Sequence, residues 1–129
     1  MNRVIKISVM VLVAVFAIST AASAQTKKWA YQSDYEEGMA CVKDDQGKWG
    51  HIDEQGKLVG QMWRNVKYFQ EGLAPVENED ELWGFVDKTG KVVIPFNFKN
   101  AYSFEKGNAK VQDADRQWRK IDKTGKYIE

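Results

Sequence analysis

An internal repeat of 34 to 35 residues constrains this chain more than any other feature of its sequence. A block that starts with Trp49-Gly50 returns at Trp83-Gly84 and again at Trp118, and each copy has Asp-x-x-Gly-Lys four residues after the tryptophan. A second block keeps the same step, with a glycine 11 residues before each tryptophan. Such a repeat is typical of small units that bury their apolar faces only by stacking. The repeated turn residues are Gly38, Asp53 and Gly56, then Gly72, Asp87 and Gly90, then Gly107, Asp122 and Gly125.

Each unit has the pattern of three short antiparallel strands. In the first copy the apolar alternation and the turn residues predict strands over 39–43, 48–53 and 57–62. The aspartate of Asp-x-x-Gly accepts a hydrogen bond from the backbone two residues on, and the glycine supplies the positive φ that closes a type I turn with a bulge. The linkers between units, such as 96–106, hold aromatic residues and asparagine and leave room for a helical turn.

We therefore predict an all-β fold, a tandem array of three hairpin-based units at about 27–60, 61–95 and 96–129. No segment after residue 24 sustains an amphipathic helical period over three turns. The alternative is closure of the three units around a pseudo-threefold axis, as in a trefoil, for which units of about 35 residues are short.

The two blocks resemble the bacterial WG (KWG) repeat family over essentially all of residues 29–129. The shared pattern is Phe/Tyr-x-Glu/Lys-Gly-x-Ala-x-Val, followed by Trp-Gly-x-Ile-Asp-x-x-Gly-Lys-x-Val. The resemblance implies a β-rich tandem array in an exported bacterial protein, and it implies no catalytic residues. The third copy departs from the pattern at Arg119, in place of glycine, and at Asn108, in place of an apolar residue. These departures predict a solvated terminal cap.

Residues 1–24 are typical of a cleaved export signal. Arg3 and Lys6 precede a 12-residue apolar run over 7–18, and small residues follow up to Ala24. The apolar run is shorter than the roughly 20 residues that span a membrane, although an uncleaved anchor is the alternative. We expect cleavage after about Ala24 and a secreted or periplasmic mature chain with no membrane attachment.

Charge and motif content exclude several classes of function. The chain has 19 Lys+Arg and 18 Asp+Glu, and this near-neutral balance argues against nucleic-acid binding. The single cysteine, Cys41, excludes an internal disulfide framework. The sequence has no Gly-rich phosphate loop, paired-carboxylate motif or zinc signature, and the acidic tips such as Asp44-Asp45 lack calcium-loop spacing. We therefore expect no cofactor and no metal.

Cys41 and His51 are the candidate chemical pair. If Lys43 pairs with Lys48, the two side chains point apart, and if Lys43 pairs with Trp49, Cys41 lies directly opposite His51. The second register also places Ala40, Val42, Gly50 and Ile52 on one face. Because no orienting group or oxyanion hole is visible, we expect no catalytic dyad. The expected role of Cys41 is instead oxidation of an exposed thiol, pairing of that thiol between molecules, or none.

We expect a non-enzymatic binding module of the cell envelope, whose partner is an unknown protein or an envelope polymer. Two aromatic sets recur in register and are assigned to packing between units: Trp49, Trp83 and Trp118, and Trp29, Trp63 and Phe98. Self-association through an open sheet edge is also expected. The alternatives are a glycan that stacks on exposed aromatic rings, and an enzyme that uses Cys41 and His51. The candidate binding surface is His51, Trp63, Tyr68 and Tyr102.

Overall fold

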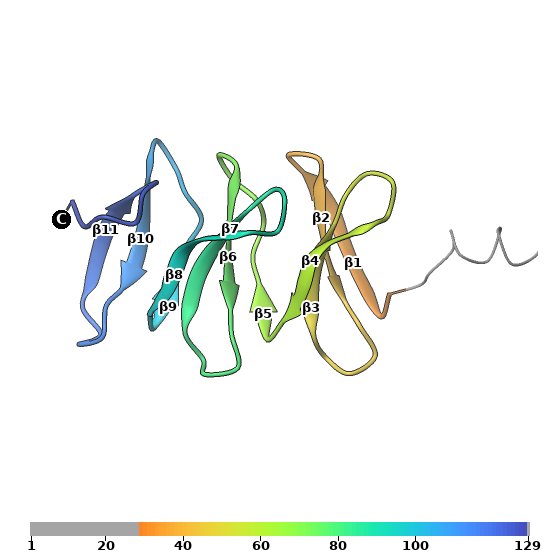
Figure 1. The fold of residues 1–129 in the computed structure, drawn as a ribbon, viewed down its shortest axis with the longest axis horizontal. Helices are drawn as coiled ribbons and strands as arrows, with labels where there is room; N and C mark the ends of the chain where they lie inside the picture. The colour runs from red at the N-terminus through yellow and green to blue at the C-terminus, as the bar shows by residue number, and fades with distance from the viewer. Residues whose placement is uncertain (1–28, 129) are drawn as a thin grey trace, which may run out of the picture.

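The computed structural model describes residues 29–128 as three antiparallel β-sheets that follow one another along a single axis (Figure 1). Their strand orders are β1-β2-β3-β4, β5-β6-β7-β8 and β11-β10-β9. The predicted export signal lies outside the described residues. The strands are β1 Tyr31–Glu36, β2 Met39–Lys43, β3 Trp49–Ile52, β4 Leu58–Trp63, β5 Asn65–Val66, β6 Leu73–Glu77, β7 Trp83–Asp87, β8 Val92–Phe98, β9 Asn100–Ala101, β10 Asn108–Gln112 and β11 Trp118–Asp122.

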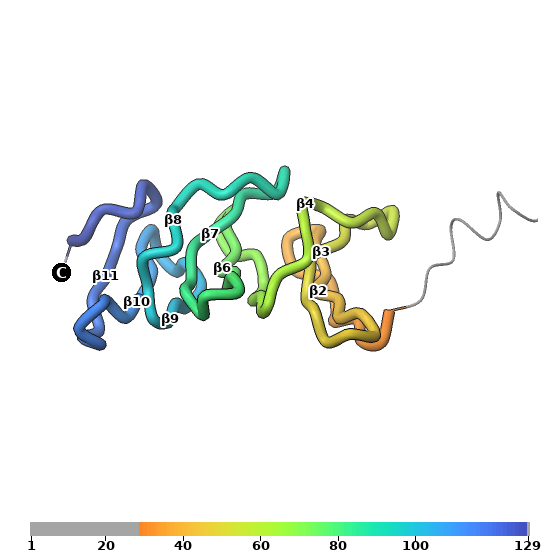
Figure 2. The backbone as a smooth tube through the Cα atoms, turned by 60° about the horizontal axis from the view of Figure 1, so that its bottom comes forward, coloured from red at the N-terminus to blue at the C-terminus, as the bar shows by residue number. Residues whose placement is uncertain are grey.

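The units form an open row, so the predicted all-β tandem array is confirmed and the trefoil alternative is wrong. Figure 2 shows the same succession from another direction, with the first described strand and the C-terminus at opposite ends of the row. Residues 29–128 contain no helix. Each sheet is a nearly independent hydrogen-bonded unit, so contact between sheets must come from side chains and turns.

The Asp-x-x-Gly turns are built as the sequence predicts. The Asp53 carbonyl accepts the Gly56 N–H at 2.9 Å, and the Asp53 carboxylate accepts the N–H groups of Gln55 and Lys57 at 3.0 Å. Gly56 has φ +80°, which favours glycine. The equivalent turns at Asp87 and Asp122 make the same backbone bonds, so β3–β4 and β7–β8 are connected alike.

The linkers carry short strands, and the helical turn considered for 96–106 is wrong. Val66 of β5 pairs with Val76, and β9 pairs with β10 in the same way. The extended backbone buries Val66, and the turn that follows also buries Phe69. A linker therefore supplies the first strand of the following sheet, and the first two sheets end at Trp63 and Phe98.

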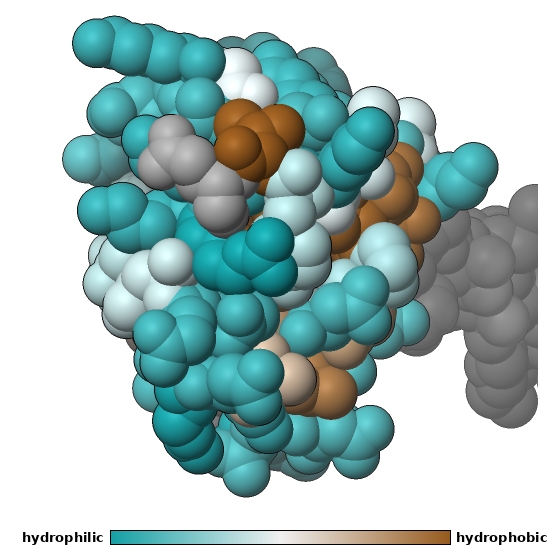
Figure 3. Space-filling model, turned by 90° about the vertical axis from the view of Figure 1, so that its left-hand side faces the viewer, coloured by the Kyte–Doolittle hydropathy of each residue, from teal (hydrophilic) through white to brown (hydrophobic). Residues whose placement is uncertain are grey.

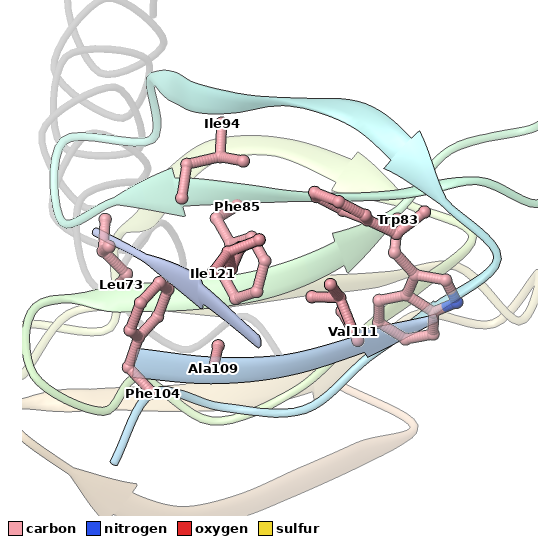
Figure 4. Close-up of a cluster of buried hydrophobic side chains, with 10 residues drawn as sticks. Leu73, Trp83, Phe85, Ile94, Phe104, Ala109, Val111 and Ile121 are labelled. Atoms are coloured by element: carbon pink, nitrogen blue, oxygen red, sulfur yellow. The ribbon is translucent and has the colours of Figure 1, made fainter. Parts of the chain in front are cut away.

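The largest core cluster lies between the second and third sheets (Figure 4). Phe85 and Trp83 of β7 face the inner side of β10 and β11, where Val111 and Ile121 are fully buried. Phe104, from the linker before β10, packs edge to face on Phe85 with ring centroids 5.0 Å apart. The buried residues of this cluster are Leu73, Trp83, Phe85, Ile94, Phe98, Ala101, Phe104, Ala109, Val111 and Ile121.

The first interface repeats this arrangement with different side chains. Met39 and Cys41 of the first sheet pack against Val76 and Val86 of the second. Phe69 lies edge to face on His51 at 4.6 Å, as Phe104 does on Phe85. The opposite face of the first sheet buries Ala40, Val42 and Ile52, with Trp29 packed on them, as the predicted alternation requires.

A glutamate of each of the first two units is bound by the turn of the following unit. The Glu37 carboxylate accepts the N–H groups of Glu71 and Gly72 at 2.7 and 3.0 Å. The Glu71 carboxylate accepts those of Lys106 and Gly107 at 2.6 and 2.9 Å. Lysines of the following unit add charge, because Lys88 lies 3.6 Å from Glu37 and Lys123 lies 3.4 Å from Glu71. We call these contacts of Glu37 and Glu71 the glutamate ladder. The third unit has Lys106 at the glutamate position, so the ladder ends there.

Adjacent units also meet backbone to backbone. The turn between β7 and β8 reaches across to β4 (Figure 1), and a Cβ on Gly90 would lie only 2.5 Å from the Gly60 Cα. The equivalent turn of the third unit, which follows β11, lies against β8. A Cβ on Gly125 of this turn would lie 3.0 Å from the Ile94 side chain. These glycines are therefore needed both for the turn and for the approach of neighbouring units.

The outer face of the third sheet is polar, as the predicted cap requires. Viewed along the array, this end is mostly hydrophilic (Figure 3). Asn108, Lys110 and Lys120 occupy the positions that hold Leu73, Pro75 and Phe85 in the second unit and Met39, Cys41 and His51 in the first. Arg119 replaces the glycine that β8 approaches closely in the second unit, and its guanidinium lies 3.7 Å from the Tyr127 ring centroid.

The matching tryptophans occupy graded surroundings, and this grading generates a stability prediction. Trp83 is 5% exposed, whereas Trp118 is 45% exposed and stacks on Tyr102. Trp83→Ala should lower the free energy of unfolding by about 3–5 kcal/mol, through a cavity at the second interface. Trp118→Ala should cost about 1 kcal/mol, the value of one stacked aromatic pair. Urea denaturation of both variants measures the difference, and equal losses would contradict a core built between the sheets.

The glutamate ladder generates a pH prediction. Partial burial raises the pKa of Glu37, but the Gly72 and Glu71 N–H groups and Lys88 outweigh it and hold the pKa below 4.5. The Gly107 N–H likewise lowers the pKa of Glu71. Each group stabilises the fold fully above pH 4.5, and this contribution is lost as pH falls through the lowered folded pKa.

The double variant Glu37→Gln/Glu71→Gln should therefore have a lower melting temperature at pH 7 and a flatter decline in stability from pH 5 to pH 3. Glu105→Gln, an exposed glutamate beside the third turn, is the matched control. Thermal unfolding followed by circular dichroism checks both effects. An unchanged acid profile in the double variant would show that the ladder contributes nothing.

Candidate functional site

The structure places Cys41 directly opposite His51, so it selects the register that pairs Lys43 with Trp49. Both residues are buried between the first and second sheets, with His51 only 2% exposed. The expected exposed thiol is therefore wrong, because Cys41 occupies a core position of the first interface.

The environment of this pair keeps both groups uncharged at neutral pH. Burial raises the pKa of Cys41 to about 11, although the Ser33 hydroxyl opposes the shift. Burial also lowers the pKa of His51, whose Nε2 lies 2.9 Å from the Lys67 carbonyl oxygen and donates to it in the neutral Nε2–H tautomer. A buried thiol with a raised pKa is a poor nucleophile. The geometry of the pair suits packing and one interface hydrogen bond.

The proposed surface set divides into two buried and two exposed residues. His51 and Trp63 lie in the interior, so their assignment to the surface is wrong. Trp63 ends β4 opposite Trp49, and its ring lies 5.4 Å from that of Phe96 in the second unit. Tyr68 and Tyr102 are exposed. Their position in the linkers places both on the same side of the array as the cavity described next.

A cavity of about 500 Å³ opens where the first and second units meet, and it continues to the linker between the second and third units. Its floor contains the buried residues Ser33, Cys41 and Val66, and aromatic side chains form much of its wall. Tyr31 contacts Trp49 edge to face, with ring centroids 5.7 Å apart. The lining residues are Tyr31, Ser33, Cys41, Trp49, Val66, Lys67, Tyr68, Tyr102 and Ser103.

Ser33 is the residue that leaves this space open. The repeat-equivalent residues are Lys67 and Tyr102, and each covers the tryptophan of its own unit. The Lys67 ammonium lies 4.7 Å from the Trp83 ring centroid, and Tyr102 stacks on Trp118 at 5.3 Å. A serine side chain is too short to do the same. Its hydroxyl accepts the Cys41 N–H at 2.8 Å and donates to the Asp34 carbonyl oxygen.

Lys67 forms a fixed positive wall of the cavity. Its ammonium lies between the rings of Trp83 and Tyr102 and donates to the Ala101 carbonyl oxygen at 2.6 Å. Burial lowers the pKa of Lys67, and the negative charge of Glu77 opposes this shift. A second cation, Lys43, lies 5.6 Å from the Trp49 ring centroid. The cavity therefore combines aromatic surface with positive charge, and none of its lining residues is acidic.

The acidic hairpin tips have a structural role that the sequence reasoning missed. The carboxylates of Asp44 and Asp113 each accept two backbone N–H groups of their own turns, and Asn78 does the same in the second unit. The signal was Asp44-x-x-Gly47, the same pattern as in the later turns. Residues 29–128 contain no cluster of three or more potential metal-ligating His, Cys, Asp or Glu side chains. The same residues contain no helix long and apolar enough to cross a bilayer.

His51 generates a pH prediction that its repeat partner can test. Because burial holds the folded pKa below 6.5, the unfolded chain binds the proton more readily. His51 therefore contributes stability that is present above pH 6.5 and is lost as pH falls through the folded pKa. His51→Phe, which copies Phe85, should flatten the stability profile between pH 7 and pH 5. Urea denaturation at each pH checks this, and a slope equal to that of the parent chain would contradict it.

The repeats identified from the sequence match a known family model. The model described as the WG containing repeat matches residues 49–81 and 83–115, two tandem copies that together cover just over half of the chain. No curated protein matches the chain. The two matched stretches start at the repeat tryptophans Trp49 and Trp83, whose strands β3 and β7 occupy equivalent places in consecutive sheets. The chain belongs to the WG containing repeat family.

Proposed function

We propose that this protein is a non-catalytic binding module whose ligand site is the aromatic cavity between the first two units. The observation that carries the proposal is the cavity itself, about 500 Å³ in volume and lined by Tyr31, Trp49, Tyr68 and Tyr102. Aromatic pockets with a few polar groups are common ligand sites. Tyr31, Tyr68 and Tyr102 are also well exposed, although most other large apolar side chains are used between the sheets.

Two features support a role without catalysis. The buried Cys41 thiol, with its raised pKa, and the buried His51 are poorly suited to nucleophilic chemistry. The groups that reach the cavity from the linkers are hydroxyls, aromatic rings and one lysine that is already hydrogen-bonded. This set binds and orients a ligand but supplies no activated nucleophile.

We also propose that the protein is exported and acts in the cell envelope. The support is the basic start, apolar run and small-residue exit over residues 1–24. The partner would then be an envelope protein or polymer. N-terminal sequencing of the protein recovered from the producing cell tests this directly, since export predicts a mature start near Gln25 and an intact Met1 would contradict cleavage.

A glycan is the second candidate ligand, and one observation favours it. Tyr102 and Trp118 stack nearly parallel, with an interplanar angle of 4°, and both are exposed. Tyr102 lines the cavity, whereas Trp118 lies outside it. Because Lys67 and Trp118 already lie against the Tyr102 ring, the exposed Trp118 ring is the one that offers an apolar face to a sugar. A glycan would therefore contact Trp118, whereas a ligand confined to the cavity would not.

The proposal predicts binding that depends on the cavity wall. In a calorimetric screen of peptidoglycan fragments, oligosaccharides and extended peptides, at least one ligand should bind, and Tyr68→Ala should weaken it about tenfold, or 1.4 kcal/mol. Val93→Ala, an exposed apolar residue outside the cavity, is the matched control and should leave affinity unchanged. A ligand that binds equally well to parent and Tyr68→Ala would contradict the site. A further loss in Trp118→Ala would identify the glycan mode.

A further inference from the structure

We propose that the cavity beside Trp49 receives the ring of a tyrosine side chain from an extended polypeptide partner. The inference rests on the proposed binding function and specifies its ligand. It is drawn from a comparison of the three units with one another, because the second and third units fill the equivalent space with their own side chains.

The equivalence of Ser33, Lys67 and Tyr102 is shown by the backbone as well as by the repeat. The N–H of Lys67 donates to the Pro75 carbonyl oxygen at 3.0 Å, and the N–H of Tyr102 donates to that of Lys110 at 2.9 Å. Pro75 and Lys110 are the counterparts of Cys41, which lies opposite the bulge that contains Ser33. The three residues therefore leave the backbone at the same point of each unit.

The chain itself thus shows two ways to occupy the space over a repeat tryptophan. In the second unit an alkyl chain with a terminal ammonium, Lys67, lies over Trp83 at 4.7 Å. In the third unit a phenol ring, Tyr102, stacks on Trp118 at 5.3 Å with an interplanar angle of 4°. In the first unit the same space is vacated by Ser33 and forms part of the cavity wall next to Trp49.

Charge favours the ring over the ammonium. Lys43 already lies over the Trp49 ring at 5.6 Å, and Lys67 forms the opposite side of the cavity. A third cation would face both without an acidic residue among the lining side chains, and like charges placed together at an interface disfavour binding. A phenol ring carries no charge, stacks on tryptophan, and presents its hydroxyl to lysine or to the nearby serines.

The shape of the cavity favours a polypeptide as the source of the ring. The lining residues come from strands β1, β2 and β3 of the first sheet and from both linkers, so the hollow extends along the array rather than closing around one ring. Its volume of about 500 Å³ exceeds the needs of a single phenol and leaves space for flanking main chain. Tyr68, Tyr102 and Ser103 border this extension, where peptide groups could pack on rings and bond to hydroxyls.

The test is a titration of the full mature chain with acetyl-Gly-Tyr-Gly-amide, followed by the Trp49 indole N–H resonance. The expected result is a saturable shift in the millimolar range, larger than any shift caused by acetyl-Gly-Lys-Gly-amide, acetyl-Gly-Leu-Gly-amide or an N-acetylglucosamine oligomer. Ser33→Tyr should weaken the tyrosine peptide at least tenfold, because the new side chain fills the cavity as Tyr102 covers Trp118. Gln46→Tyr, on an exposed turn, should bind as the parent does.

A second variant guards against a folding defect in Ser33→Tyr, which loses the acceptor of the Cys41 N–H. Ser33→Lys/Cys41→Pro copies the second unit, where Pro75 has no N–H to satisfy, and it should also abolish the shift. A larger Trp49 shift with the lysine peptide would overturn the tyrosine assignment. So would the absence of a tyrosine-peptide shift while another ligand still binds in a Tyr68-dependent way, a result that leaves the proposed function standing. Failure of every ligand to bind would overturn both.

Discussion

The structure depends on contact between faces that a single unit cannot cover. Each sheet has three or four short strands, and a sheet of this size is marginal unless an apolar face is packed. The sheets are stacked so that the residue after the repeat glycine, His51 or Phe85, receives the aromatic ring of the following linker. The glutamate ladder and the approach of Gly90 to Gly60 fix the spacing between units. The same repeated sequence therefore specifies both the local hairpins and the packing between units.

At the two ends of the described array, the residues at these contact positions differ from those inside it. Lys106 stands where Glu37 and Glu71 bind the next turn, and Lys120 stands where His51 and Phe85 receive a ring. In the first unit Glu54 replaces the lysines that pair with the preceding glutamate, and it approaches Gly38 of its own unit. The positions that join neighbouring units inside the array thus carry, on the outer faces, either polar side chains or side chains of the opposite charge.

The candidate site arises from a departure of another kind. Ser33 occupies the repeat position at which Lys67 and Tyr102 cover the tryptophans of their own units. Because serine is too short to cover Trp49, a cavity remains in the first unit where the other two units have a side chain. A repeat protein can in this way acquire a site by deleting one side chain from a regular pattern, without any change in the fold.

Much of the fold could be predicted from the sequence, since strands β2, β3 and β4, the Asp-x-x-Gly turns, the open array and the polar cap follow from local patterns. Strand β1, over Tyr31–Glu36, was not predicted, so the first sheet has four strands where three were expected. The linkers could not be predicted, because the burial of Val66 and Phe69 is decided by the neighbouring unit rather than by local propensity. The surface assignment was wrong for His51 and Trp63 for the same reason. The residue type at the His51 position changes from unit to unit, and the Trp63 position is aromatic in every unit, but neither pattern shows which face of the sheet packs against the next sheet. The candidates Tyr68 and Tyr102 are exposed and line the cavity. Ser33 was not among the candidates, because its significance depends on the larger side chains at the equivalent positions of the other two units.

The central claim is that a unit does not fold without its neighbour, and a peptide of residues 29–63 tests it most directly. This segment contains every strand of the first sheet but lacks Val66 and Phe69 and the turn that binds Glu37. Circular dichroism and amide proton dispersion should show an unfolded peptide under conditions in which the whole chain is folded. A cooperative thermal transition in the isolated peptide, with protected β-strand amides, would contradict the account.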